Sequence, residues 1–197
     1  PVDENPWLDV IRNNHVVGSN VWAAIEYLGE TWGSGWPAKG MNGAIVDLCG
    51  FKKAPAAFYE RYFKDDPVIR IIVCDEKVKM HERTAPVAWY FPNMANHWSH
   101  SDIKDGTATI VKTVTNCETV ELYMNGTFIG KKQKVHDDDR EITWNVDYLS
   151  GEIKAVGLIG GEIVCEEVLK TAGPAAKVQL TSDRKLLKSD KTDIIHI

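Results

Sequence analysis

The stretch TVELYMNGTFIGKK, residues 119–132, holds two short strand-like runs separated by an Asn-Gly pair. Asn125-Gly126 is a strong hairpin signal, because the tight turns that join antiparallel strands need positive φ at their central residues. Gly160-Gly161 in LIGGEI repeats this signal later in the chain. The two stretches together predict antiparallel strands joined by short hairpins.

Runs of the same kind continue on both sides of this stretch. They occur at residues 68–73, 86–91, 107–114, 119–124, 127–132, 142–146, 152–159 and 162–169. About seven or eight short strands within ~100 residues are typical of an immunoglobulin-like β-sandwich. We expect Leu122, Trp144, Val146 and Val156 of this sandwich to be buried.

The region before these strands has a mixed α/β character. The apolar residues of HVVGSNVW, from Val16 to Trp22, predict a short buried strand. A glycine-rich loop follows, and GAIVDLCG is a second short apolar run. APAAFYERYFKDD then predicts a helix, because Pro55 suits a first helical turn and apolar residues up to Phe63 recur on one face.

The end of the chain has a different pattern. Gly173-Pro174 is typical of a linker. AKVQLTSDRKLL and TDIIHI are strand-like, and the chain stops at Ile197 within an apolar run. A segment of this length cannot bury a core of its own. We therefore expect the chain to be a fragment of a longer protein.

Composition and charge exclude several classes of function. The chain has a net charge of -5, whereas a nucleic-acid-binding protein needs clustered Lys and Arg. No run is apolar for long enough to span a membrane. Cys49, Cys74, Cys117 and Cys165 are widely spaced, so we interpret them as buried thiols without disulfides rather than as zinc ligands. The aspartates at 137–139 are typical of a solvated loop.

A longer motif, VVGSNVWAAIEYLGE, is similar to the last barrel strand and following loop of glycoside hydrolase family 2, the β-galactosidase group. The resemblance continues in GWPAKG, IVDLCGFKKAPAAFYERYF, HWSHSDIKDG, VELYMNGTFIGKK, WNVDYLSGEIKAV and TAGPAAKVQLTSDR, so it covers nearly the whole chain. This chain departs from the family's pattern at Asn20, Ala23-Ala24 and Glu26, where the family has an apolar residue, Thr-Gly and Asp. These departures concern the local geometry of the loop.

The resemblance implies a mainly β fold in three parts. Residues 1–66 would be the C-terminal end of a (β/α)8 catalytic barrel, with its last strand and helix. Residues 67–172 would be the immunoglobulin-like sandwich, and residues 173–197 the truncated start of a further β-sandwich. In such barrels, the loops at the carboxyl ends of the strands form the active site. Aromatic faces beside glycines suit a sugar pocket, because sugars present flat C–H patches as well as hydroxyl groups.

The resemblance implies three substrate-binding candidates. Trp22 matches the family's residue on the floor of the sugar site, where a cis peptide bond follows it; the alternative is a plain core aromatic. Asn42 matches a Met-Asn-Gly stretch that some β-galactosidases place against the sugar and a monovalent cation, and the alternative is an ordinary Asn-Gly turn. Trp36, together with Trp32, would form an outer aromatic rim.

Catalytic residues are not expected in this chain. The family hydrolyses glycosides with retention, which needs two glutamates roughly 5–5.5 Å apart. By resemblance, both lie on barrel strands before Val16, and neither Glu26 nor Glu30 matches them. His97 and His100 are more typical of a loop that docks the sandwich than of a metal site.

The sequence therefore predicts the C-terminal fragment of a retaining glycoside hydrolase that acts on β-galactosides or related β-glycosides. The expected partners are the carbohydrate substrate and the rest of the enzyme chain, with a homo-oligomer left open. No cofactor is expected beyond the monovalent cation. The resemblance to bacterial polysaccharide-degrading enzymes favours a periplasmic or secreted location. A carbohydrate-binding module and a purely structural spacer remain as alternatives, and the fragment alone is expected to be inactive.

Overall fold

A computed structural model describes residues 10–31, 35–41, 44–74, 94–101, 103–134, 141–189 and 192. Its elements are β1 (Tyr27–Leu28), β2 (Gly40–Met41), α2 (Ala56–Phe63), β3 (Ile69–Cys74), β4 (Thr107–Thr115), β5 (Thr119–Met124), β6 (Thr127–Gln133), β7 (Glu141–Tyr148), β8 (Glu152–Ile159) and β9 (Glu162–Lys170). The predicted strand at 86–91 and the aspartates at 137–139 lie outside the described residues. The other strands predicted between residues 68 and 169 are all present. In the part of the chain described, no helix is long and apolar enough to cross a membrane.

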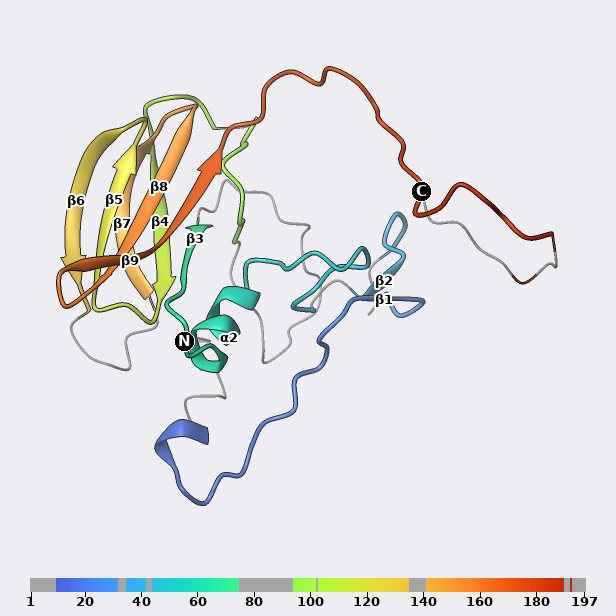
Figure 1. Cartoon of the computed structure of the whole chain (residues 1–197), viewed down its shortest axis with the longest axis horizontal. Coiled ribbons are helices and arrows are strands. Elements are labelled where there is room, and N and C mark those ends of the chain that lie inside the picture. Colours follow the sequence, from blue (N-terminus) through green and yellow to red (C-terminus); the bar gives the residue numbers. More distant parts are fainter. Residues whose placement is uncertain are drawn as a thin grey trace.

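Strands β3 to β9 form a β-sandwich of two antiparallel sheets. One sheet has the order β3-β4-β7, and the other has the order β6-β5-β8-β9. Figure 1 shows the two sheets packed face to face, with β6 at one edge and β9 leading into the C-terminal segment. The chain crosses between the sheets from β4 to β5, from β6 to β7 and from β7 to β8, as it does in immunoglobulin-like sandwiches. The mainly β fold class is therefore confirmed for this region.

Two hairpins of the four-stranded sheet turn where the sequence predicts. Asn125 and Gly126 have φ values of 48° and 78°, and Gly160 and Gly161 have φ values of 58° and 86°. Asn125 also holds the neighbouring turn, because its side-chain nitrogen donates to the carbonyl of Ser150 at 3.1 Å. The turn residues thus set the register of the strands that they join.

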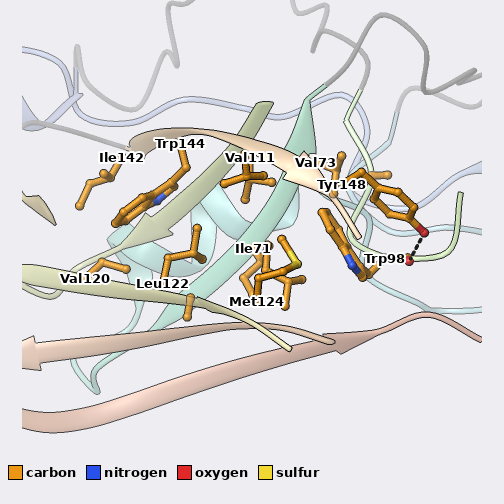
Figure 2. Packing of buried hydrophobic residues seen from close by; sticks show 14 of the residues in the cluster. Ile71, Val73, Trp98, Val111, Val120, Leu122, Met124, Ile142, Trp144 and Tyr148 are labelled. Carbon is orange, nitrogen blue, oxygen red and sulfur yellow. Dashed lines mark hydrogen bonds between the residues drawn. The ribbon is translucent and has the colours of Figure 1, made fainter. Parts of the chain in front are cut away.

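Large aromatic rings fill the space between the sheets. Figure 2 shows Trp98 and Tyr148 at one end of the core cluster and Trp144 at the other. The indole nitrogen of Trp98 donates to the carbonyl of Leu149 at 2.9 Å. The backbone carbonyl of Trp98 accepts hydrogen bonds from the hydroxyls of Tyr148 and Thr171. The loop that carries Trp98 is therefore a fixed part of the sandwich.

The burial predicted for four residues of the sandwich is confirmed. Leu122, Trp144, Val146 and Val156 are all at most 8% exposed. The indole nitrogen of Trp144 donates to the hydroxyl of Thr113 at 3.0 Å, so its one polar atom is satisfied inside the core. Strand alternation places Leu122, Trp144 and Val146 on the faces that meet between the sheets. Val156 is buried beside buried Ala155 and lies opposite Glu121, so alternation does not account for its burial.

Helix α2 covers the outer face of β3 and β4. Phe58 of the helix packs with Ile72 of β3 and Val114 of β4 in a second buried cluster. Both faces of β3 are therefore buried, which explains the nearly continuous apolar run in this strand. The sequence predicts this helix, but Phe63 at its end is exposed and does not belong to the buried face.

An ion-pair network joins α2 to both sheets. Glu60 of α2 is 9% exposed and accepts hydrogen bonds from Lys52 at 2.5 Å and from Arg70 of β3 at 2.7 Å. Arg70 also lies 3.7 Å from Glu167 of β9, whose carboxylate accepts a hydrogen bond from the amide of Ile71. Burial opposes ionisation of Glu60, but its bonds to Lys52 and Arg70 outweigh burial and lower its pKa. Burial dominates at Glu167 and raises its pKa.

Two segments expected to be strands are not strands in the structure. Val17 is fully exposed and Trp22 is 60% exposed, so residues 16–22 do not form the predicted buried strand. Residues 176–187 likewise contain no strand, and Val178 is exposed. A strand needs hydrogen-bonded neighbours, and no described residue pairs with either segment. The apolar pattern predicts strand preference, but it does not supply the neighbouring strand.

The four cysteines are free thiols, as the sequence predicts. Cys117 is buried, and Cys74 and Cys165 are partly buried. Cys49 is exposed, so the expectation of burial is wrong for this residue. It lies in a turn where its amide donates to the side chain of Asp47 at 2.9 Å.

Replacing Trp98 by alanine should lower the free energy of unfolding by about 3–5 kcal/mol, the usual cost of removing a large buried aromatic side chain. Guanidinium denaturation followed by circular dichroism measures this change. Phe128→Ala removes an exposed ring and serves as the control, with an expected change below about 1 kcal/mol. Equal losses of stability in the two variants would contradict this assignment of the core.

Glu60→Gln should destabilise the protein by about 1–3 kcal/mol at neutral pH, because charge-assisted hydrogen bonds are lost. The folded-state pKa of Glu60 is lowered from 4.5, so its contribution is present above that value and disappears as the pH falls through the folded-state pKa. Denaturation curves of both proteins should therefore converge as the pH is lowered through the folded-state pKa, which lies below 4.5. Glu166→Gln, which affects an exposed ion pair with Lys154, should cost less than about 1 kcal/mol. A Glu60→Gln effect that does not change with pH would refute this interpretation.

Candidate functional site

Trp22 lies on a segment outside the sandwich, near the short strands β1 and β2. Figure 1 shows this segment beyond α2, apart from the two sheets. The ring of Trp22 is 60% exposed, so it is not a core aromatic among the described residues. The peptide bond between Trp22 and Ala23 is cis, as the family resemblance implies.

Two hydrogen bonds in series orient the edge of the Trp22 ring. The indole nitrogen donates to the hydroxyl of Tyr27 at 3.1 Å. The same hydroxyl donates to the carboxylate of Glu30 at 2.7 Å. An indole N–H can only donate, whereas a tyrosine hydroxyl can accept one bond and donate another. The bonds engage the indole edge, and 60% of the residue remains exposed.

Backbone pairing holds Tyr27 in position. β1 pairs with β2, and Tyr27 lies opposite Met41. A side chain at Gly40 would place its Cβ 2.2 Å from the carbonyl oxygen of Tyr27, so glycine is required for this close approach. On the other side, the amide of Glu26 donates to the carbonyl of Val46 at 2.9 Å. The backbone after Trp22 is thus fastened to two separate segments.

The two glutamates of this loop have partners within the chain. Glu26 is largely buried and forms an ion pair with Lys53, just before α2. Glu30 accepts the hydrogen bond from Tyr27. Both carboxylates therefore hold the loop together, and the expectation that neither is catalytic stays a prediction.

Of the other two substrate-binding candidates, the structure describes Trp36 but not Asn42. Trp36 is 85% exposed, and the ammonium of Lys39 lies 5.7 Å from the centre of its ring. No ring contact joins Trp36 to Trp22 within the parts of the chain that the structure describes. Asn42 and Trp32 lie outside these parts, so the sugar and cation contacts expected at Asn42 stay predictions.

The segment with two histidines belongs to the junction between the sandwich and the preceding region. His97 and His100 flank buried Trp98 in the sequence, and their rings are 4.8 Å apart. The side chain of Asn96 donates to the carbonyl of Lys52 at 2.9 Å, which ties this loop to the segment before α2. Over the described ranges, no group of three or more His, Cys, Asp or Glu side chains could hold a metal ion.

Sequence reasoning alone missed Tyr27. It lies five residues after Trp22 and three before Glu30. In an irregular backbone, such intervals do not predict which side chains lie close together. The available signal was chemical, because an exposed indole on a polar loop needs an acceptor and a tyrosine followed by a carboxylate supplies one.

Comparisons with known proteins show which families this chain is similar to. Residues 106–165 match a family described as a domain of unknown function (DUF4982). Over 191 residues, the chain is 28% identical to a β-galactosidase of Bacteroides ovatus, and the match covers 96% of this chain and 19% of that protein. It is 30% identical over 168 residues to a putative β-glucuronidase of Formosa agariphila, covering 84% of this chain and 14% of that protein.

The fold is similar to the crystal structure of a glycosyl hydrolase family 2 member from Bacteroides cellulosilyticus. The TM-score is 0.81 at 28% identity, covering 96% of this chain and 26% of that one. The homologues of this chain are glycoside hydrolases of family 2. The resemblance read from the sequence is confirmed. This family 2 homologue spans less than a fifth of the length of the two curated relatives.

Replacing Tyr27 by phenylalanine removes the acceptor of the Trp22 indole and should leave the fold intact. The indole N–H resonance of Trp22 in a ¹⁵N–¹H spectrum should shift upfield and exchange faster with water, because its hydrogen bond is lost. The indole resonance of Trp144, which is bonded to Thr113 inside the sandwich, is the internal control and should not move. An unchanged Trp22 resonance would rule out the hydrogen-bond series.

Proposed function

We propose that this chain is the C-terminal part of a retaining glycoside hydrolase that acts on β-galactosides or related β-glycosides. The observation that carries the proposal is the placement of Trp22, an exposed indole whose edge is bonded to Tyr27. Relatives named as a β-galactosidase and a putative β-glucuronidase support the same class of substrate, a β-linked sugar.

In this proposal the chain contributes binding rather than bond cleavage. An aromatic face packs against the C–H patch of a sugar ring, and it excludes water from one side of the pocket. Retaining hydrolysis also needs an acid/base and a nucleophilic glutamate, and we assign both to the part of the enzyme that precedes this chain. Residues 1–66 would then complete the barrel, with Trp36 on the rim and Asn42 beside the sugar. A homo-oligomer and a periplasmic or secreted location remain part of the proposal.

A second function, carbohydrate binding by the sandwich itself, rests on one aromatic pair. Tyr123 and Phe128 lie on the outer face of the four-stranded sheet, with ring centroids 5.5 Å apart. Glu121 accepts a hydrogen bond from Tyr123 at 2.7 Å on the same face. Two rings and a carboxylate are fewer than most sugar sites use, so we place this function second. Titration of the chain with galactose and oligosaccharides, compared with Phe128→Ala, tests it.

The purified 197-residue chain should not hydrolyse a nitrophenyl β-galactoside or a nitrophenyl β-glucuronide, because neither proposed catalytic glutamate is present. Extending the chain with the sequence that precedes it in the full enzyme should restore hydrolysis of at least one of them. Turnover by the short chain, after contaminating enzymes are excluded, would reassign catalysis to carboxylates such as Glu26 and Glu30.

In the active, extended protein, Trp22→Ala should lower kcat/KM by roughly 10- to 100-fold, through loss of an aromatic contact to the glycosyl ring in the transition state. Trp36→Ala should have a smaller effect, because a rim residue contacts the ring less. Phe51→Ala removes an exposed aromatic side chain to which no binding role is assigned, and it serves as the control. If Trp22→Ala and Phe51→Ala lose equally little activity, Trp22 does not contact the sugar.

A further inference from the structure

Two cysteines that are distant in sequence meet inside the sandwich. Cys117 precedes β5 and Cys165 lies in β9, 48 residues later, yet their sulfur atoms are 3.4 Å apart. Cys117 is fully buried, and Cys165 packs against the main core cluster. At this separation the two thiols are in direct contact, with one S–H directed at the other sulfur.

Gly157 of β8 makes the space in which the two sulfurs meet. A Cβ at this position would lie 2.6 Å from the sulfur of Cys117 and 2.8 Å from that of Cys165, closer than side-chain atoms pack. Gly157 is also the cross-strand partner of Cys165, next to a shift in the register of β8 and β9. Any larger residue at position 157 would force the sulfurs to move, so glycine serves the thiol pair here rather than a turn.

We propose that Cys117 and Cys165 form an oxidation site, which closes to a disulfide in the presence of a low-molecular-weight disulfide such as oxidised glutathione. The sulfurs of a disulfide are about 2.05 Å apart, so closure needs a movement of little more than ~1 Å, shared between two side chains. The bond would link the start of β5 to β9 across β8.

The reaction is a two-step thiol–disulfide exchange. The thiolate of Cys165, the more exposed of the pair, attacks one sulfur of oxidised glutathione, forms a mixed disulfide and releases one glutathione thiolate. The sulfur of Cys117 then attacks Sγ of Cys165, forms the protein disulfide and releases the second glutathione thiolate. The two cysteines lose two electrons and two protons. The electrons reduce the glutathione disulfide, and the protons end on the two glutathione thiols.

The remaining cysteines do not compete for this bond. Cys74 packs against the cluster between α2 and the outer face of β3, so the sheet separates it from Cys165. Cys49 is exposed in a turn outside the sandwich. The proposed pairing is therefore the one that the fold brings into contact.

The environment of Cys165 favours a lasting cross-link over a rapid redox cycle. Burial, reinforced by the hydrogen bond with Cys117, raises the pKa of Cys165 to about 12. Little thiolate is present at neutral pH, so exchange with glutathione is slow in both directions. A disulfide formed here would act as a stabilising staple, because it restricts the unfolded chain.

The test uses the 197-residue chain carrying Cys49→Ser, which removes the exposed thiol that glutathione would otherwise modify. The protein is incubated with oxidised glutathione, then unfolded and alkylated without reductant, and analysed by mass spectrometry. The number of alkylated thiols should fall from three to one, with a peptide cross-linked between Cys117 and Cys165. The thermal midpoint of the oxidised protein should rise by about 5 °C or more over the reduced protein.

Cys117→Ser in the same background is the matched control, and it should gain no thermal stability from oxidation. Gly157→Ala should slow closure roughly tenfold or more, because the added methyl group displaces the sulfurs. Three alkylated thiols after prolonged oxidation of the folded protein would overturn the proposal. A stable glutathione adduct on the intact pair, or a cross-link to Cys74, would overturn it as well.

Discussion

Strand β3 is buried on both faces, and the positions of the other elements depend on this double burial. Ile71 points into the space between the two sheets, whereas Ile72 points toward α2 on the outside. An edge strand that is covered on both faces cannot slip by one residue without exposing one apolar set and burying the other. Helix α2 can therefore pack on β3 only when β3 keeps its observed pairing register with β4. Glu167 completes this arrangement, because its carboxylate accepts a hydrogen bond from the amide of Ile71 at the strand's free edge.

A series of charged contacts extends from this strand to the loop with Trp22. Arg70 bonds to Glu60 of α2, and Glu60 also bonds to Lys52. The next residue, Lys53, pairs with Glu26, which lies in the backbone stretch that follows Trp22. Ion pairs in water contribute little individually, but these involve glutamates that are largely buried, so breaking one leaves a poorly solvated charge. The series fixes the path of the chain between sandwich and loop more than it stabilises either one.

The sequence predicts the sandwich well and the loop poorly, for a physical reason. In the sandwich each strand has a partner, so alternation and the turn at Asn125-Gly126 decide the structure. In residues 16–22 the same apolar preference has no described partner, and Trp22 is exposed instead of buried. The link from Trp22 to Tyr27 depends on an irregular backbone that no period encodes. The contact between Cys117 and Cys165 could not be predicted from the sequence either. It depends on which strands are neighbours in the sheet, and the sequence pattern does not show this.

The sandwich supports the loop that carries Trp22 through the elements between them. β1 and β2 each have two residues, and so short a pair has little stability alone. An aromatic platform, however, must be held to a fraction of an ångström for its contact to favour a transition state. The loop must therefore obtain its rigidity from its attachments, which are Lys53 and the backbone around Val46. These attachments lead directly into α2, which is packed on β3. A change in the sandwich core would thus alter the position of Trp22, even though the two lie in different parts of the fold.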